Sequence, residues 1–331
     1  MPSRLRDAFT SPRFSQPATF MRLPYSTNLS GIDVAIVGVP FDGGTSYRPG
    51  SRLAPREIRA QSSLIRPYNY FQQVAPFDRL HVVDAGDIDA SPVSLDQAYM
   101  SIEEGIGAIV KAGALPVAVG GDHSISLPIL RALARVHGPL ALVQFDSHMD
   151  TWPQDFGSPY FHGSPFWHAV HEGVVDPKRF VQVGLRGPMY APDDFAFQEQ
   201  HGITVRDIGQ VRERGLAATM AEVRRVATGP AFVTFDIDVV DPAFAPGTGT
   251  PEVGGFTSEE AQWLVRGLVA GGPRGEATAG GAKVEGGDGG VRLVGCDLVE
   301  VSPPFDGPGH ITSLLAANLL FEMLCVIARS R

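Results

Sequence analysis

Short apolar segments alternate with longer amphipathic ones along most of the chain. Residues 140–145 (LALVQF) are almost wholly apolar, which is the pattern of a strand buried on both faces. Between residues 94 and 111 the apolar positions instead recur at the spacing of one helix face. The same two patterns predict strands at 33–39, 80–83, 115–119, 140–145, 180–183, 203–205, 231–235 and 293–298, and helices at 55–64, 94–111, 125–137, 217–227, 257–268 and 312–329.

This alternation predicts an α/β fold with a mostly parallel sheet that helices cover on both faces. No linker or internal repeat divides the chain, so we expect one domain over residues 1–331, with an N-terminal arm at 1–30. Residues 271–290 are rich in Gly and Ala and contain one large apolar residue, Val284. Such a segment cannot pack into a core, and we interpret it as a flexible surface insertion.

The composition is that of a globular protein. The chain has 331 residues, of which 44% are hydrophobic and 19% charged. Its formal net charge of −9, without any block of Lys or Arg, argues against a nucleic-acid partner. Cys296 and Cys325 lie in apolar runs and are expected to be buried thiols. The longest apolar run, 314–328, is interrupted by Asn318 and Glu322, so we expect a cytoplasmic protein without a membrane partner.

Polar residues follow the apolar segment 140–145 directly, in the sequence Asp146-Ser147-His148-Met149-Asp150. If the extended conformation continued, Asp146, His148 and Asp150 would point to one side, because side chains alternate along a strand. Carboxylates are costly to bury together, and a divalent cation would remove that cost. A solvated loop of acidic residues explains the same pentad equally well, so the pentad alone does not decide between them.

Other metal-binding side chains stand where two further predicted strands end. His123 follows strand 115–119, and Asp236 and Asp238 follow strand 231–235. The carboxyl ends of parallel strands meet at one edge of a sheet, where ligands bind in open α/β folds. With the pentad, two imidazoles and four carboxylates are too many for a single Zn²⁺. They suit two ions bridged by carboxylates, with Mn²⁺ as the first candidate and Ni²⁺ or Co²⁺ as alternatives.

Several motifs surround these residues. They are GGDHS at 120–124, DSHMD at 146–150, HGSP at 162–165, FDIDVVDPA at 235–243, APGTGTP at 245–251 and EVSP at 300–303. Together they resemble the ureohydrolase (arginase/agmatinase) family, over about residues 20–324. The resemblance implies a three-layer α/β/α fold around an eight-stranded sheet, a binuclear manganese centre and a homo-oligomer (trimer or hexamer). It also implies hydrolysis of a small guanidino compound to urea and an amine.

The resemblance further implies a role for each residue. Asp146 and Asp236 would bridge the two ions, and Asp150 would additionally orient the attacking water. His162 would relay a proton to the leaving amine, and Glu300 would bind the guanidinium. One ion would be held by His123, Asp146, Asp150 and Asp236, and the other by Asp146, His148, Asp236 and Asp238.

The tail of the substrate is predicted from the loop at 151–161, which follows the pentad. The loop contains Trp152, Asp155 and Tyr160 and no Lys or Arg, which suits a cationic or neutral tail. Agmatine is therefore favoured over 4-guanidinobutyrate. Arg48, in the loop after the first strand, is the counter-argument, because it could bind a substrate carboxylate at the mouth of the site.

Other functions are compatible with the same motifs. A guanidinobutyrase or guanidinopropionase would differ only in the tail that it binds. A nickel-dependent hydrolase of guanidine or of a biguanide such as metformin would differ in its metal. An inactive paralogue that stabilises a partner subunit is disfavoured, because such proteins usually lose a ligand. Here all six metal-binding residues, together with His162 and Glu300, are present.

Overall fold

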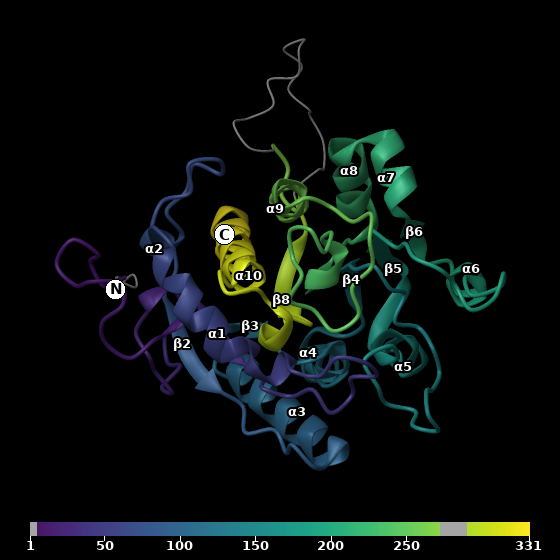
Figure 1. Cartoon of the computed structure of the whole chain (residues 1–331), viewed down its shortest axis with the longest axis horizontal. Helices are drawn as coiled ribbons and strands as arrows, with labels where there is room; N and C mark the ends of the chain where they lie inside the picture. Colours follow the sequence, from purple (N-terminus) through teal and green to yellow (C-terminus); the bar gives the residue numbers. More distant parts are fainter. Residues whose placement is uncertain (1–4, 272–289) are drawn as a thin grey trace, which may run out of the picture.

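The strands form one sheet in the order β2-β1-β3-β8-β7-β4-β5-β6, and every pairing between them is parallel (Figure 1). The computed structural model describes residues 5–271 and 290–331, so the predicted insertion at 271–290 lies, except for its two ends, outside the described residues. The strands are β1 (Val34–Gly38), β2 (Val82–Asp87), β3 (Leu115–Val119), β4 (Leu140–Phe145), β5 (Val175–Val183), β6 (Thr204–Arg206), β7 (Pro230–Asp236) and β8 (Arg292–Val299). Each overlaps a predicted strand, but β5 begins five residues earlier than its apolar run, and β2 shares only Val82 and Val83 with the prediction of 80–83.

Helices connect the strands. They are α1 (Ala54–Gln61), α2 (Pro76–Arg79), α3 (Leu95–Lys111), α4 (Ser126–His137), α5 (Pro165–His171), α6 (Ala196–His201), α7 (Ile208–Arg214), α8 (Leu216–Val226), α9 (Ser258–Arg266) and α10 (Ile311–Ser330). The sequence does not predict α2, α5, α6 and α7. These helices have between 4 and 7 residues, which is too short for a helical period to be recognised.

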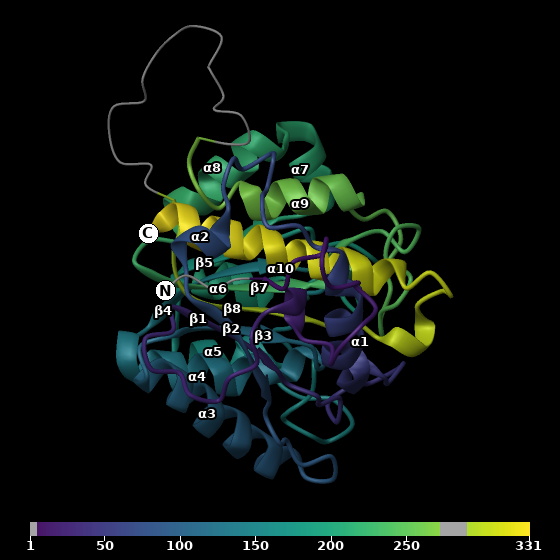
Figure 2. The same ribbon diagram turned by 90° about the vertical axis from the view of Figure 1, so that its left-hand side faces the viewer.

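Both faces of the sheet are covered (Figure 2). Helices α3, α4 and α5 pack on one face, and α10, α9 and α8 pack on the other. Strands β1, β3 and β4 are buried along their whole length, as their continuous apolar runs predict. The core on the α10 side also contains Phe20 and Met21, so the end of the predicted N-terminal arm belongs to the core.

The closing helix α10 is apolar on nearly all sides. By length and composition alone it could cross a membrane, because an 18-residue window within it has a mean hydropathy of 2.0. However, 83% of that window is buried inside the protein. Its apolar composition is that of a helix packed into a core.

The order of the strands decides where the polar strand ends meet. Strands β3, β8, β7 and β4 are consecutive neighbours in the middle of the sheet, and all four run in the same direction. Their carboxyl ends therefore lie side by side at one edge. Each of these ends is followed by residues that the sequence predicts to be functional.

Candidate active site

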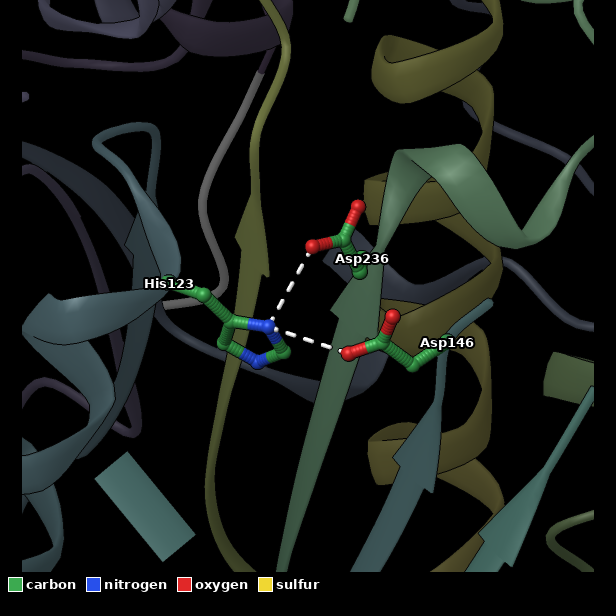
Figure 3. Close-up of side chains that lie close together, drawn as sticks. All are labelled: His123, Asp146 and Asp236. Atoms are coloured by element: carbon green, nitrogen blue, oxygen red, sulfur yellow. Dashed lines mark ion pairs between the residues drawn. The ribbon is translucent and has the colours of Figure 1, made fainter. Parts of the chain in front are cut away.

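His123 faces a group of carboxylates. Its Nδ1 atom lies 2.8 Å from Asp150 Oδ2. The same atom lies 3.1 Å from Asp146 Oδ2 and 3.2 Å from Asp236 Oδ2 (Figure 3). On the other side of the ring, Nε2 lies 2.8 Å from Thr234 Oγ1. With a cation on Nδ1, the ring proton would lie on Nε2 and be donated to Thr234.

A second group lies beside the first and shares Asp146 with it. His148 Nδ1 lies 3.0 Å from Asp238 Oδ2 and 3.6 Å from Asp146 Oδ1. Ser147 donates two hydrogen bonds to the other oxygen of Asp238, from its backbone N–H at 3.1 Å and from its hydroxyl at 2.6 Å. Within each group the candidate ligand atoms lie within 4.8 Å of one another; the groups are His123, Asp146 and Asp236, and Asp146, His148 and Asp238.

These atoms suit divalent cations. His123 Nδ1 and Asp238 Oδ2 are buried and make no hydrogen bond, so each offers a lone pair to its group. In the described part of the chain, none of the carboxylates that face His123 and His148 forms an ion pair with Lys or Arg. Buried carboxylates at this density require positive charge nearby, and cations shared through Asp146 would supply it. The residues therefore fit a pair of divalent metal ions.

The carboxyl groups of the site differ in acidity. Burial acts to raise the pKa of Asp146, but the adjoining imidazoles of His123 and His148 outweigh it and lower that pKa. Burial, together with the charge of Asp146, raises the pKa of Asp150 to about 6. Burial and two neighbouring carboxylates raise the pKa of Asp236. Without a cation, part of the site would hold protons that metal binding displaces.

Turns, and not strand alternation, bring these side chains together. Strand β4 ends before the pentad, and Asp150 adopts a left-handed backbone conformation with φ 52°. Asp236 is the last residue of β7, whereas Asp238 lies in the 3-10 helix η5 (Ile237–Val239), where its N–H donates to the Asp236 carboxylate at 2.8 Å. The predicted residues do converge. The prediction that strand alternation would bring them together is wrong.

His162 and Glu300 form a buried pair next to the first group. His162 Nδ1 lies 2.9 Å from Glu300 Oε1, which also accepts a hydrogen bond from the His123 backbone N–H at 2.9 Å. Glu300 Oε2 is buried and makes no hydrogen bond, so it is free to accept one from a guanidinium. Glu300 has a φ of 61°, a conformation that such a side chain rarely adopts and that structures often retain at functional sites.

The proton on His162 faces Glu300. Burial acts to lower the pKa of His162, but the charge of Glu300 and the hydrogen bond with it raise the pKa to about 9. Ser46 contacts the other ring nitrogen, Nε2, with its backbone N–H at 3.2 Å and its hydroxyl at 2.7 Å. Because the Ser46 N–H can only donate, it favours a neutral ring and so opposes the effect of Glu300. In both ring states Nδ1 carries a proton directed at Glu300.

A cavity of about 860 Å³ opens onto the site and is lined in part by His148, Asp150, His162 and Asp236. Glu300, which is predicted to bind the guanidinium, does not line the cavity and is 1% exposed. Of the residues predicted to contact the substrate's tail, Arg48, Trp152 and Asp155 do line it. Tyr160 does not line it. Its ring packs on His168, with 4.6 Å between the ring centroids, and the predicted substrate contact of Tyr160 is therefore corrected.

Comparison with known proteins agrees with the family resemblance that the motifs indicate. The family model described as "Arginase family" matches residues 32–325. The chain belongs to the arginase family. It is 48% identical over 326 residues to guanidinopropionase from Pseudomonas aeruginosa, with 98% of this chain and 96% of that protein covered. It is 44% identical over 310 residues to mitochondrial agmatinase from Gallus gallus, with 93% and 85% covered. The solved structure of proclavaminate amidino hydrolase from Streptomyces clavuligerus superposes with a TM-score of 0.87 at 40% identity and covers 97% of this chain and 100% of that chain.

Membership in the arginase family confirms the predicted fold and the predicted class of reaction. The chain is a hydrolase that acts on the C–N bond of a guanidino compound, an amidinohydrolase. The predicted α/β/α architecture with an eight-stranded parallel sheet is confirmed. The two groups of His and Asp residues agree with the metal dependence of the family.

Four of the residues that contact the site escape prediction from the sequence. They are Ser46, Thr234, Gln144, whose Nε2 donates to Asp146 Oδ2 at 2.7 Å, and Arg186, whose backbone N–H donates to the Ser147 carbonyl at 3.0 Å. Ser46 and Arg186 lie in loops that carry no motif of their own. Thr234 gives a weak signal, because it is a polar residue inside the apolar strand β7 and is fully buried.

Proposed function

We propose that this amidinohydrolase acts on a linear guanidino acid and that Arg48 binds the carboxylate of the substrate. One observation carries the proposal. The Arg48 side chain lines the cavity without a hydrogen bond or ion pair to any described residue, and its guanidinium lies 5.2 Å from the ring centroids of both Tyr47 and Phe305. A guanidinium that is positioned by aromatic rings but has no acceptor suits a carboxylate.

The other charged residues of the cavity include the acidic side chains Asp155, Asp194 and Glu252, so the argument for an acidic substrate rests on Arg48. Arg186, the second arginine in the lining, already donates to backbone carbonyls. Asp155 could bind the amine of agmatine; its Oδ1 atom accepts a hydrogen bond from the Phe156 N–H at 2.9 Å. The relatives allow both substrates, since guanidinopropionase is named for a guanidino acid and agmatinase for an amine. The free cation of Arg48 leads us to prefer the acid to the agmatine that the loop at 151–161 favours.

Each step of the reaction has a residue suited to it. Two divalent cations held by the groups around His123 and His148 would lower the pKa of water and so supply a nucleophile near neutral pH. Glu300 would accept hydrogen bonds from the guanidinium through Oε2 and hold its carbon in place. Asp150 would accept a hydrogen bond from the attacking water and orient it. His162, when charged, would give a proton to the leaving amine and regain the proton that the attacking water releases, so that urea and the amine separate.

We further propose Mn²⁺ as the metal, with Ni²⁺ and Co²⁺ as alternatives. Four carboxylates and two imidazoles form a donor set that is rich in oxygen but includes nitrogen, as Mn²⁺ prefers. Metal-stripped protein supplied with Mn²⁺, Ni²⁺ or Co²⁺ should release urea fastest with Mn²⁺. Activity on guanidine or metformin with Ni²⁺ alone would favour the nickel-dependent alternative. No urea release with any of these metals would favour an inactive paralogue.

The substitution Arg48→Gln tests the proposed substrate. A hydrogen bond between charged groups contributes about 1.5–3 kcal/mol, so kcat/KM for 3-guanidinopropionate and 4-guanidinobutyrate should fall roughly 10- to 100-fold. For agmatine, which has no carboxylate, kcat/KM should change by less than about threefold on the same argument. A urea-release assay over these substrates, with arginine and guanidine included, measures both effects.

Arg56→Gln is the matched control, because Arg56 is an exposed arginine near the same loop that does not line the cavity. It should leave all the rates unchanged. A wild-type preference for agmatine, or an equal loss on agmatine and on the acids in Arg48→Gln, would contradict the proposed role of Arg48.

We also propose that the chain forms a homo-oligomer, a trimer or a hexamer, as the resemblance to the family implies. The exposed rings of Phe9 and Phe14 near the N-terminus are consistent with a contact between copies of the chain. Light scattering after size-exclusion chromatography gives the mass directly. A mass of 35.4 kDa, that of one chain, would contradict the proposal.

A further inference from the structure

The guanidinium of Arg186 is surrounded by backbone carbonyls of two loops. Arg186 lies just beyond the carboxyl end of β5, and its Nη2 atom lies 2.6 Å from the Asp238 carbonyl and 2.8 Å from the Glu252 carbonyl. Its Nη1 atom lies 3.0 Å from the Val239 carbonyl, and its Nε atom lies 3.2 Å from the Val253 carbonyl. One side chain thus connects the turn that carries Asp238 to the loop at 252–253.

No carboxylate pairs with this cation in the described part of the chain, since each hydrogen bond found for its guanidinium ends on a backbone carbonyl. Burial lowers the pKa of Arg186, although an arginine remains charged at physiological pH. The cost of burying the charge is therefore offset by carbonyl dipoles that converge on it. Such an arrangement favours one backbone conformation around the half-buried guanidinium, because turning these carbonyls away would remove its hydrogen-bond acceptors.

Arg186 also reaches the pentad. Its backbone N–H donates to the Ser147 carbonyl at 3.0 Å, and Ser147 in turn donates to Asp238 Oδ1 through its N–H and its hydroxyl. Both oxygens that face His148 in the second group, from Asp146 and Asp238, therefore lie on turns that Arg186 contacts. Asp146 also belongs to the first group, but of the other two members His123 follows β3 and Asp236 ends β7, and in the described part of the chain neither makes a hydrogen bond with Arg186.

We propose that Arg186 is a positioning residue for the second metal-binding group, Asp146, His148 and Asp238. Its guanidinium holds the turn of Asp238, its N–H holds the pentad, and together these contacts set the distance between Asp238 and His148. Loss of the guanidinium lowers the affinity for the second metal ion and leaves the first site in place. This inference rests on the proposed pair of metal ions.

Metal binding tests the inference without an activity assay. Equilibrium dialysis against buffered Mn²⁺, with metal analysis of the protein, gives the number of ions bound and both dissociation constants. Wild-type protein should bind two Mn²⁺ per chain. In Arg186→Met the dissociation constant of the weaker site should rise roughly 10- to 100-fold, as for other residues that orient ligands, while the tighter site changes little. Arg186→Lys keeps the charge but cannot reach both loops at once, and it should raise the same constant by roughly three- to tenfold.

Arg179→Met is a control. Arg179 lies in β5 towards the amino ends of the strands, and its guanidinium binds the backbone carbonyls of Thr228 at 2.9 Å and Pro139 at 2.7 Å and pairs with Asp176 at 2.8 Å. This variant should lower the melting temperature of the metal-free protein without changing either Mn²⁺ constant.

Different results of the Mn²⁺ measurement would refute the role of Arg186 and the proposed pair of metal ions. Fewer than two Mn²⁺ on the wild-type protein would refute the metal pair itself. Two Mn²⁺ with wild-type constants on Arg186→Met, accompanied only by a lower melting temperature, would show that Arg186 serves stability alone and would overturn the inference. If Arg186→Met does not fold, Arg186→Lys decides, and unchanged constants in that variant overturn the inference as well.

Discussion

At the scale of single residues, Thr234 orients the imidazole of His123. Thr234 lies inside strand β7, is fully buried, and places its Oγ1 atom 2.8 Å from Nε2 of His123. A cation on Nδ1 requires the ring proton to lie on Nε2, and that proton then needs an acceptor. Thr234 provides one and keeps Nδ1 directed at the carboxylates.

The substitution Thr234→Val should weaken metal binding while preserving the fold. Valine has nearly the same shape and suits a strand, but it leaves the buried Nε2–H without a partner, at a cost of about 1–3 kcal/mol. The dissociation constant of the site that contains His123 should rise about tenfold or more, as measured by competition between the protein and a chelator for Mn²⁺.

Thr219→Val serves as the control for this substitution. Thr219 is equally buried, but its hydroxyl donates to the Gly215 carbonyl at the start of α8, away from the metal-binding groups. Its Mn²⁺ constants should equal those of the wild type. Equal constants in Thr234→Val would show that the Thr234 hydroxyl does not orient His123.

At the scale of elements, a buried ion pair joins the last two helices. Arg266 of α9 pairs with Glu322 of α10, and both side chains are at most 5% exposed. Glu322 also accepts hydrogen bonds from Asn69 at 2.9 Å and from Gln72 at 2.6 Å, both in the loop before α2. The pair and its two amide partners thus tie two helices and a loop together on the face of the sheet that α10 covers.

Arg266→Met should destabilise the protein strongly. Methionine leaves the Glu322 charge buried without its cation, and breaking a buried pair in this way costs about 3–5 kcal/mol. The double substitution Arg266→Met and Glu322→Gln should recover part of that loss, because no uncompensated charge remains. Urea denaturation of the metal-free variants measures the change in midpoint and slope.

The exposed pair Arg131–Glu172 provides the comparison. Its side chains are 23% and 32% exposed, so solvent screens the interaction, and Arg131→Met should cost no more than about 1 kcal/mol. Equal losses in Arg266→Met and Arg131→Met would mean that the Arg266 pair does not hold α9 and α10 together.

At the scale of the whole molecule, the metal-binding groups lie where four central strands of the sheet end. Their ligands and Glu300 follow β3, β4, β7 and β8, four neighbouring strands from distant parts of the chain. Cations bound at their carboxyl ends would link these strands, and removal of the cations would leave buried carboxylates facing one another. Metal binding and the stability of the fold are therefore expected to be coupled.

Chelation of the metal should lower the melting temperature of the protein. A ligand present at 100 times its dissociation constant stabilises the folded state by about 2.7 kcal/mol, and two ions add their effects. Differential scanning calorimetry with excess Mn²⁺ and with EDTA measures the difference. Identical melting temperatures in the two conditions would argue against the coupling.

The metal-free protein should also lose stability as the pH rises. In the folded chain the pKa of Asp150 is raised to about 6 and that of Asp236 is raised as well, whereas an unfolded aspartate titrates near about 3.9. Between these values the folded state holds more protons than the unfolded state, so its stability falls from about pH 4 through pH 6. Melting curves of the EDTA-treated protein at pH 5 and pH 8 should show the lower temperature at pH 8. The reverse order would contradict the protonated apo site.

Much of this protein follows from the sequence alone. Hydrophobic periodicity determines the eight strands and the longer helices, because burial on one or both faces leaves a local pattern. The local motifs also indicate the family, and each of the six candidate metal ligands stands within five residues of the carboxyl end of a strand. The short helices α2, α5, α6 and α7 escape because they hold too few residues to repeat a period.

The tertiary structure alone decides how these residues act together. It places Asp150 and Glu300 in left-handed turns, turns Tyr160 away from the cavity and leaves Arg48 without an acceptor. It also brings Arg186 to the carbonyls of the Asp238 turn. Each of these facts depends on contacts between segments that are far apart in the chain and on backbone angles that no periodicity records. The sequence shows which side chains are present and which strand end each one follows. The distances between these side chains are set only when the strands take their order in the sheet.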